Sequence, residues 1–191
     1  MSVRAAWPRG DRILSAFLSE SWPWTMNPIY VGDSYDLVKR YFGQELAKLG
    51  YEVVVDPRFT GEWSGKEESY FRLIGAKHVR DPRSPNARLA LFMDPDTGIN
   101  AAGGFRHVSF DQIGEAAQEY DMVFVFDQSF SRQQDPGSVM VKKLAELTRI
   151  GLHAMYYDSH ARFVFASKDG SAINELNRHL LRTGLPESRL V

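Results

Sequence analysis

Apolar residues recur along this chain at two spacings, one typical of amphipathic helices and the other of buried strands. The helical spacing predicts helices over 34–48, 64–75, 110–119, 138–150 and 171–182. Short runs of apolar and β-branched residues predict strands over 51–55, 89–93, 122–126, 153–157 and 162–166. Because strands and helices alternate, the pattern predicts an α/β fold in which helices cover both faces of a mostly parallel sheet.

Start and stop signals support several of these elements. Gly50 and Gly151 follow two of the predicted helices, as glycine commonly does. Ser64 and Ser109 each precede a Glu or Gln by three residues, which is the form of a capping box and predicts two helix starts. The last two strands are joined by a tight turn at 158–160, so they must form an antiparallel hairpin. The expected fold is therefore a Rossmann-like three-layer sandwich with a C-terminal antiparallel hairpin.

Residues 1–28 are expected to form an arm that is distinct from the main domain. Three of the four tryptophans, Trp7, Trp22 and Trp24, lie here among prolines, and 12–18 has the spacing of a short amphipathic helix. We expect this arm either to pack on the main domain or to dock on a second subunit, which would give a homo-oligomer. Residues 29–191 are then expected to be a single Rossmann-like domain.

Composition excludes several classes of function. The chain has 191 residues, a formal net charge of −1 and no cysteine. Disulfides, thiolate zinc sites and a cysteine nucleophile are therefore excluded, and no global positive charge attracts nucleic acid or an acidic membrane. No stretch approaches the ~18 apolar residues of a membrane span, and the amino terminus does not have the pattern of a signal peptide. We expect a cytoplasmic protein without a membrane partner.

Acidic residues follow three of the predicted strands. Asp56, Asp94 and Asp127 each come at the end of a strand, and Asp158 follows a fourth. Because the carboxyl ends of parallel strands meet at one edge, we expect these carboxylates to converge on a common crevice. Clustered carboxylates either hold a hard cation or act as acid and base, although Asp also serves as an ordinary turn former and helix cap.

Two polar segments at this edge are the strongest candidates for chemistry. Asp94 and Asp96 lie in the segment Asp94-Pro95-Asp96-Thr97-Gly98, where Gly98 is expected to supply a positive φ. In the segment after the next strand, Ser129 can donate a hydrogen bond and Arg132 can bind a phosphate or carboxylate. Asp36 and Lys39 are interpreted as a surface ion pair. The histidines show no metal-ligand spacing, so they predict no metal site.

The spacing Gly32-Asp33…Asp36…Lys39 followed by Asp94-Pro95-Asp96-Thr97-Gly98 resembles a family of uncharacterised bacterial and phage-borne proteins. These proteins share both motifs and a polar segment that ends in Arg after the next strand, which here is 128–132. The resemblance covers about residues 30–132 and implies the Rossmann-like fold.

The same order of motifs is similar to that of bacterial adenine-N6 methyltransferases of ribosomal RNA. The segment 53–61, which includes Asp56 and Gly61, stands where those enzymes cradle S-adenosylmethionine. Asp94-Pro95 matches the start of their Asp-Pro-Pro-Tyr motif, with Asp96-Thr97 in place of Pro-Tyr. The resemblance implies that Asp94 holds the amine of a flipped base, that Asp56 lies near the cofactor, and that Arg132 faces an anionic group.

A third resemblance is to haloacid dehalogenase-like phosphatases, whose first motif is an apolar strand followed by Asp-x-Asp-x-Thr. It implies that Asp94 attacks phosphorus and Asp96 acts as the acid, with Mg²⁺ between them. Lys142 or Lys143 and Asp158 follow in the order of the later motifs.

Three expectations of function result. The first is a diverged S-adenosylmethionine-dependent nucleic-acid methyltransferase. In it Asp94 and Asp96 are catalytic, Asp56, Gly61 and Asp127 bind the cofactor, and Thr97, Ser129 and Arg132 bind a nucleotide or nucleic acid. The second is a Mg²⁺-dependent phosphoester hydrolase that uses Asp94 and Asp96. The third is a non-catalytic binding or assembly module.

Overall fold

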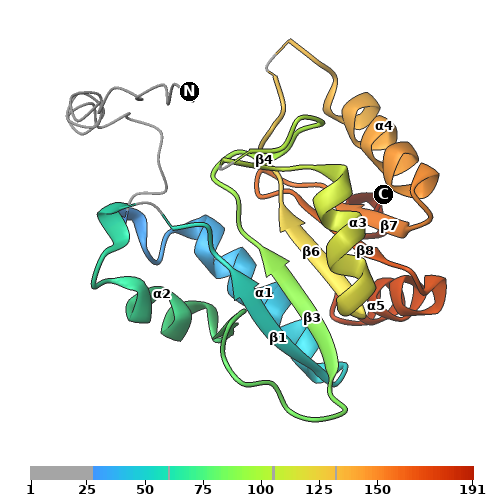
Figure 1. Cartoon of the computed structure of the whole chain (residues 1–191). Helices are drawn as coiled ribbons and strands as arrows, with labels where there is room; N and C mark the ends of the chain where they lie inside the picture. The colour runs from blue at the N-terminus through green and yellow to red at the C-terminus, as the bar shows by residue number, and fades with distance from the viewer. Residues whose placement is uncertain (1–27, 60, 105, 132) are drawn as a thin grey trace, which may run out of the picture.

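The computed structural model describes residues 28–59, 61–104, 106–131 and 133–191 (Figure 1). The arm predicted at 1–28 therefore lies outside the described residues, except for Pro28. The main sheet has six strands: β1 (Tyr51–Asp56), β2 (Lys77–His78), β3 (Arg88–Met93), β6 (Met122–Phe126), β7 (His153–Tyr157) and β8 (Phe163–Ser167). The α-helices are α1 (Ser34–Lys48), α2 (Glu67–Ile74), α3 (Phe110–Glu119), α4 (Pro136–Arg149) and α5 (Gly170–Arg182).

The strands of the main sheet lie in the order β2-β1-β3-β6-β8-β7. Neighbouring strands from β2 to β6 are parallel, whereas β8 runs antiparallel to both β6 and β7. The predicted α/β class, the mostly parallel sheet and the antiparallel pair at the C-terminal end are confirmed. None of the helices among the described residues is long and apolar enough to cross a membrane.

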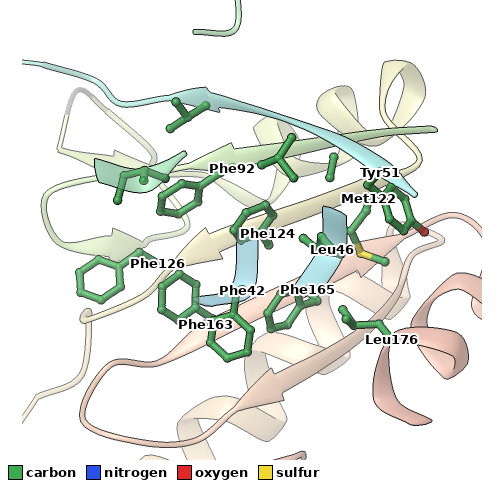
Figure 2. Close-up of a cluster of buried hydrophobic side chains, with 14 of the residues drawn as sticks. Phe42, Leu46, Tyr51, Phe92, Met122, Phe124, Phe126, Phe163, Phe165 and Leu176 are labelled. Atoms are coloured by element: carbon green, nitrogen blue, oxygen red, sulfur yellow. The ribbon is translucent and has the colours of Figure 1, made fainter. Parts of the chain in front are cut away.

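Helices cover the two faces of this sheet in separate layers. Along β3, Phe92 packs in one core with side chains from α1, α2 and α5, whereas Leu91 packs in the other core with side chains from α3 and α4. Figure 2 shows the first core, in which Phe42 and Leu46 of α1 lie against aromatic rings of the sheet. This alternation follows from the two-residue repeat of a strand and fixes which face each side chain reaches.

Local signals account for most helix ends. Asp33 caps α1 by accepting hydrogen bonds from the backbone N–H groups of Tyr35 and Asp36. The capping box at Ser109 is present at the start of α3, as predicted. The one predicted at Ser64 is wrong, because α2 begins at Glu67 with Lys66 as its N-cap and without a side-chain cap. A 3-10 turn, η2 (Gly61–Trp63), comes before that start.

Several short elements were not predicted. They are the edge strand β2, the two-stranded sheet of β4 (Gly98–Ile99) and β5 (His107–Val108), and the 3-10 turns η1 (Pro28–Tyr30) and η3 (Glu187–Arg189). Each has only two or three residues, which is too short for a periodic pattern to identify.

Candidate functional site

Asp56, Asp94 and Asp127 lie at the same edge of the sheet, because β1, β3 and β6 are parallel neighbours. Their side chains nevertheless reach different faces. The β3–β6 register pairs Phe92 with Phe124, so Asp127 lies one residue further along its strand than Asp94 does. One residue reverses the face. Asp94 and Asp127 therefore do not share the single crevice expected from the sequence.

The side chain of Asp94 points toward α1 and α2 and is fully buried. Lys39 Nζ donates to Asp94 Oδ2 over 2.8 Å, and the Tyr70 hydroxyl donates to the same oxygen over 2.5 Å. Lys39 Nζ also lies 3.1 Å from Asp36 Oδ1 and 5.0 Å from the centre of the Phe126 ring. We call Asp36, Lys39, Tyr70 and Asp94 the Asp94 cluster.

One oxygen of the Asp94 cluster is not engaged. Asp94 Oδ1 is buried and accepts no hydrogen bond from any of the described residues. Leaving a buried carboxylate oxygen unsatisfied costs free energy, so this atom requires an explanation. Lys39 and Tyr70 both bind Oδ2, so the carboxylate is held in place while Oδ1 has no donor among the described residues.

Burial and charge shift the proton equilibria of the Asp94 cluster. Burial raises the pKa of Asp94, and the ammonium of Lys39 opposes this only in part. Burial lowers the pKa of Lys39, but the carboxylates of Asp94 and Asp36 outweigh it, so that the pKa is raised overall. Burial and the charge of Asp94 raise the pKa of Tyr70 well above its ordinary value, so Tyr70 is a neutral donor.

A second group of the same three residue types surrounds Asp127 on the opposite face. Asp127 Oδ2 accepts from Lys143 Nζ over 2.5 Å and from the Tyr156 hydroxyl over 2.6 Å. Asp127 Oδ1 accepts from the backbone N–H of Ile99 over 3.0 Å and from the Ser129 hydroxyl over 2.6 Å. Both oxygens of Asp127 are therefore engaged. We call Asp127, Ser129, Lys143 and Tyr156 the Asp127 cluster.

The Asp127 cluster fastens β4 to the end of β6. A Cβ atom at Gly98 would lie 2.2 Å from Asp127 Oδ1, and the φ of Gly98 is +108°. Glycine is thus required both for the close approach and for the predicted positive φ. Burial lowers the pKa of Lys143, with Asp127 opposing this shift.

The other predicted acids are held by nearby arginines. Asp56 Oδ2 lies 3.5 Å from Arg58 Nε, and Arg58 also donates to the carbonyls of Gly104 and His107. Asp96 pairs with Arg106 over 2.6 Å, and Asp158 pairs with Arg162 over 3.0 Å. The segment after β3 is therefore tied to the segment after β1.

The remaining predicted residues are placed as follows. Thr97 Oγ1 lies 2.6 Å from His107 Nδ1 and donates to the carbonyl of Arg106. Gly61 is exposed at the start of η2, Ser129 belongs to the Asp127 cluster, and Arg132 lies outside the described residues. In the part of the chain that is described, no three His, Asp or Glu residues are arranged to hold a metal ion.

Sequence reasoning missed the partners of Asp94. Asp36 and Lys39 were interpreted as a surface pair, which is wrong, because they are only 7% and 6% exposed. A signal was present in the sequence: Lys39, Phe42 and Leu46 repeat at helical spacing and form one buried stripe of α1. Leu37 of the same helix is apolar but 55% exposed, so it does not belong to this stripe. A lysine inside an apolar stripe predicts a buried partner carboxylate.

No protein-family model matches the chain, and no curated protein and no solved structure shows a significant match to it.

Proposed function

We propose that this chain holds a nucleotide-like ligand at the carboxyl ends of β1 and β3, as a diverged S-adenosylmethionine-dependent nucleic-acid methyltransferase. The observation that carries the proposal is the single unengaged oxygen of Asp94, a residue that is otherwise fully buried and held in place. In this role Asp94 Oδ1 accepts a hydrogen bond from an N–H group of the ligand.

The position of Asp94 supports this assignment. In open α/β sheets ligands bind outside the carboxyl ends of the strands, and β3 lies near the middle of this sheet, directly beside β1. The motif resemblance assigns the cofactor to the segment after β1. In the proposal the cofactor extends from there to Asp94, and its amino group donates to Asp94 Oδ1, in place of the acceptor amine that the resemblance implies. The sheet order places these two segments next to each other.

Lys39 and Tyr70 are the positioning residues in this proposal. Both donate to Asp94 Oδ2, so the carboxylate cannot rotate without breaking two charge-assisted hydrogen bonds. A carboxylate held in this way presents Oδ1 in one direction before the ligand arrives, which reduces the cost of ordering on binding.

The geometry gives the phosphoester hydrolase less support. That reaction needs Asp94 and Asp96 to face one Mg²⁺ ion. Here Asp94 faces Lys39 and Tyr70, and Asp96 pairs with Arg106. The binding experiment below therefore includes Mg²⁺ with nucleotides as a second ligand.

Calorimetric titration and thermal unfolding with S-adenosylmethionine and S-adenosylhomocysteine test the proposal. A ligand at 100 times its dissociation constant is expected to add ~2.7 kcal/mol to the free energy of unfolding. Asp94→Asn is expected to lose this response. Tyr156→Phe, which alters the Asp127 cluster on the other face, is expected to keep it.

The proposal fails if the wild-type chain binds neither compound. Stabilisation by Mg²⁺ with nucleotides instead would favour the hydrolase. No ligand response together with a stable oligomer would favour a binding or assembly module.

A further inference from the structure

With both of its carboxylates ionised, the Asp94 cluster contains more negative than positive charge. The carboxylates of Asp36 and Asp94 share the ammonium of Lys39, over 3.1 Å and 2.8 Å. Tyr70 is neutral, because burial and the charge of Asp94 raise its pKa well above the ordinary value. One ammonium therefore balances two buried carboxylates.

The amino terminus of α1 does not remove this excess. A helix N-terminus supplies about half a positive charge, and Asp36 lies in the first turn of α1. Asp33 is the N-cap of α1, so the carboxylate of Asp33 also interacts with the partial positive charge of this helix end. Asp36 Oδ2 additionally accepts from the backbone N–H of Gly32 over 2.9 Å, which is a neutral donor.

A second, independent observation points to a ligand at this cluster. Asp94 is 0% exposed, and its Oδ1 accepts no hydrogen bond from the described residues. A buried carboxylate with excess negative charge around it gains most from a donor that also carries positive charge.

We infer that the ligand group that meets Asp94 is a cation with N–H donors, of the ammonium class, and that Asp36 determines this specificity. The inference builds on the proposed function only in using Asp94 Oδ1 as the atom that faces the ligand. It adds the charge of the ligand and a role for Asp36, whose carboxylate shares the ammonium of Lys39 with Asp94 and so favours a cationic donor over a neutral one.

Two pairs of probes that differ in one feature test the charge. The first pair is S-adenosylhomocysteine and its deaminated analogue, in which hydrogen replaces the ammonium group. The second pair is putrescine and 1,4-butanediol, which have the same length but differ in charge. Calorimetric titration of the full chain is expected to give at least about tenfold tighter binding for the charged member of each pair, equivalent to ~1.4 kcal/mol.

Two variants on α1 test the role of Asp36. Asp36→Asn removes its charge, while the amide oxygen can still accept from Gly32, so the fold is expected to persist. It should bring the affinity ratio of each pair close to one. Asp33→Asn is the matched control, because it removes a charge from the same helix end but keeps a good N-cap residue. It should change the ratios much less than Asp36→Asn does, because the ammonium of Lys39 pairs with Asp36 and Asp94. If Asp36→Asn does not fold, the probe pairs on the wild-type chain still decide the ligand charge.

Each outcome separates the two proposals. Equal binding of S-adenosylhomocysteine and its deaminated analogue overturns the inference while the proposed function survives. Preference for putrescine over butanediol that depends on Asp94, without binding of S-adenosylhomocysteine, supports the inference and overturns the proposed function. If no probe binds, Asp94 Oδ1 meets an internal water only, and both proposals fail.

Discussion

The Asp94 and Asp127 clusters share an Asp, a Lys and a Tyr, but they differ in how the second oxygen of the Asp is engaged. Each has an Asp directly after a central strand, a Lys from a helix and a Tyr hydroxyl. Both oxygens of Asp127 are engaged, partly by the backbone N–H of Ile99. Asp94 Oδ1 accepts nothing from the described residues.

Buried ion pairs at the same sheet edge therefore differ in how fully their carboxylates are engaged. The Asp127 cluster binds the backbone of β4 and is a structural fastening. The Asp94 cluster fixes its carboxylate through side chains alone and leaves one oxygen without a donor among the described residues, and in the proposed function this oxygen meets the ligand. The residue types alone do not distinguish these roles, whereas a count of satisfied atoms does.

The largest expected effect on stability comes from a substitution at Gly98, where β4 packs against Asp127. Gly98→Ala places a Cβ 2.2 Å from Asp127 Oδ1 at a φ of +108°. We expect a loss of about 3–5 kcal/mol in the free energy of unfolding, from the clash and the backbone strain together. Gly32→Ala is the control, since its φ is +90° but nothing lies within 4 Å of the added Cβ. It should cost only about 1–2 kcal/mol in urea denaturation. Equal losses would show that the contact at Asp127 is unimportant.

The two aspartates should differ in their effect on stability. Asp127→Asn leaves the buried Lys143 without a carboxylate partner and is expected to cost about 3–5 kcal/mol. Asp94→Asn should cost about 1–3 kcal/mol, because Lys39 keeps its contact with Asp36. Urea denaturation of both variants measures the difference, and a larger loss for Asp94→Asn would contradict the assigned roles.

The two tyrosines should have similar effects on stability and different effects on binding. Tyr70→Phe and Tyr156→Phe each remove one hydrogen bond to a carboxylate, which is worth about 1.5–3 kcal/mol. Only Tyr70→Phe is expected to weaken S-adenosylhomocysteine binding as well, by about tenfold. A similar loss of affinity in Tyr156→Phe would indicate a general effect of destabilisation.

The smallest expected effect is in the titration of the two lysines. The pKa of Lys39 is raised above 10.5, chiefly because its two carboxylates outweigh burial, whereas burial lowers the pKa of Lys143. NMR of ¹³Cε-labelled lysines should therefore show that Lys143 loses its proton at a lower pH than Lys39 does.

The two lysines contribute to stability with opposite signs. The contribution of Lys39 is fully present below pH 10.5 and is lost as the pH rises through its folded-state pKa. The cost of charging Lys143 applies at lower pH and disappears as the pH approaches 10.5. If Lys39 instead lost its proton at a lower pH than Lys143, the environments assigned to the two lysines would be wrong.

The sequence predicted the fold well, because long periodic elements and a tight final turn constrain the sheet strongly. It also predicted that Asp94 and Asp127 would lie at one edge. It did not predict that they face opposite sides, since this depends on a one-residue difference in register between β3 and β6. Register between distant strands is set by packing of the whole sheet and has no local signature.

Only some of the partners of Asp94 could have been predicted from the sequence. Lys39 on the buried stripe of α1 was a usable signal, whereas Tyr70 resembles any aromatic residue on an amphipathic helix. The closeness of Gly98 to Asp127 could not be predicted either, because β4 has only two residues. Its positive φ was predicted from turn chemistry, but the contact that requires glycine is tertiary.

The most direct test of the difference between the clusters is ¹³C NMR of the side-chain carboxyl carbons in aspartate-labelled protein, titrated with S-adenosylhomocysteine. Asp94→Asn and Asp127→Asn spectra assign the two resonances. We predict that saturating ligand shifts the Asp94 carboxyl resonance and leaves that of Asp127 in place. An Asp94 resonance that does not move while the ligand binds, or equal shifts at both residues, would contradict the account.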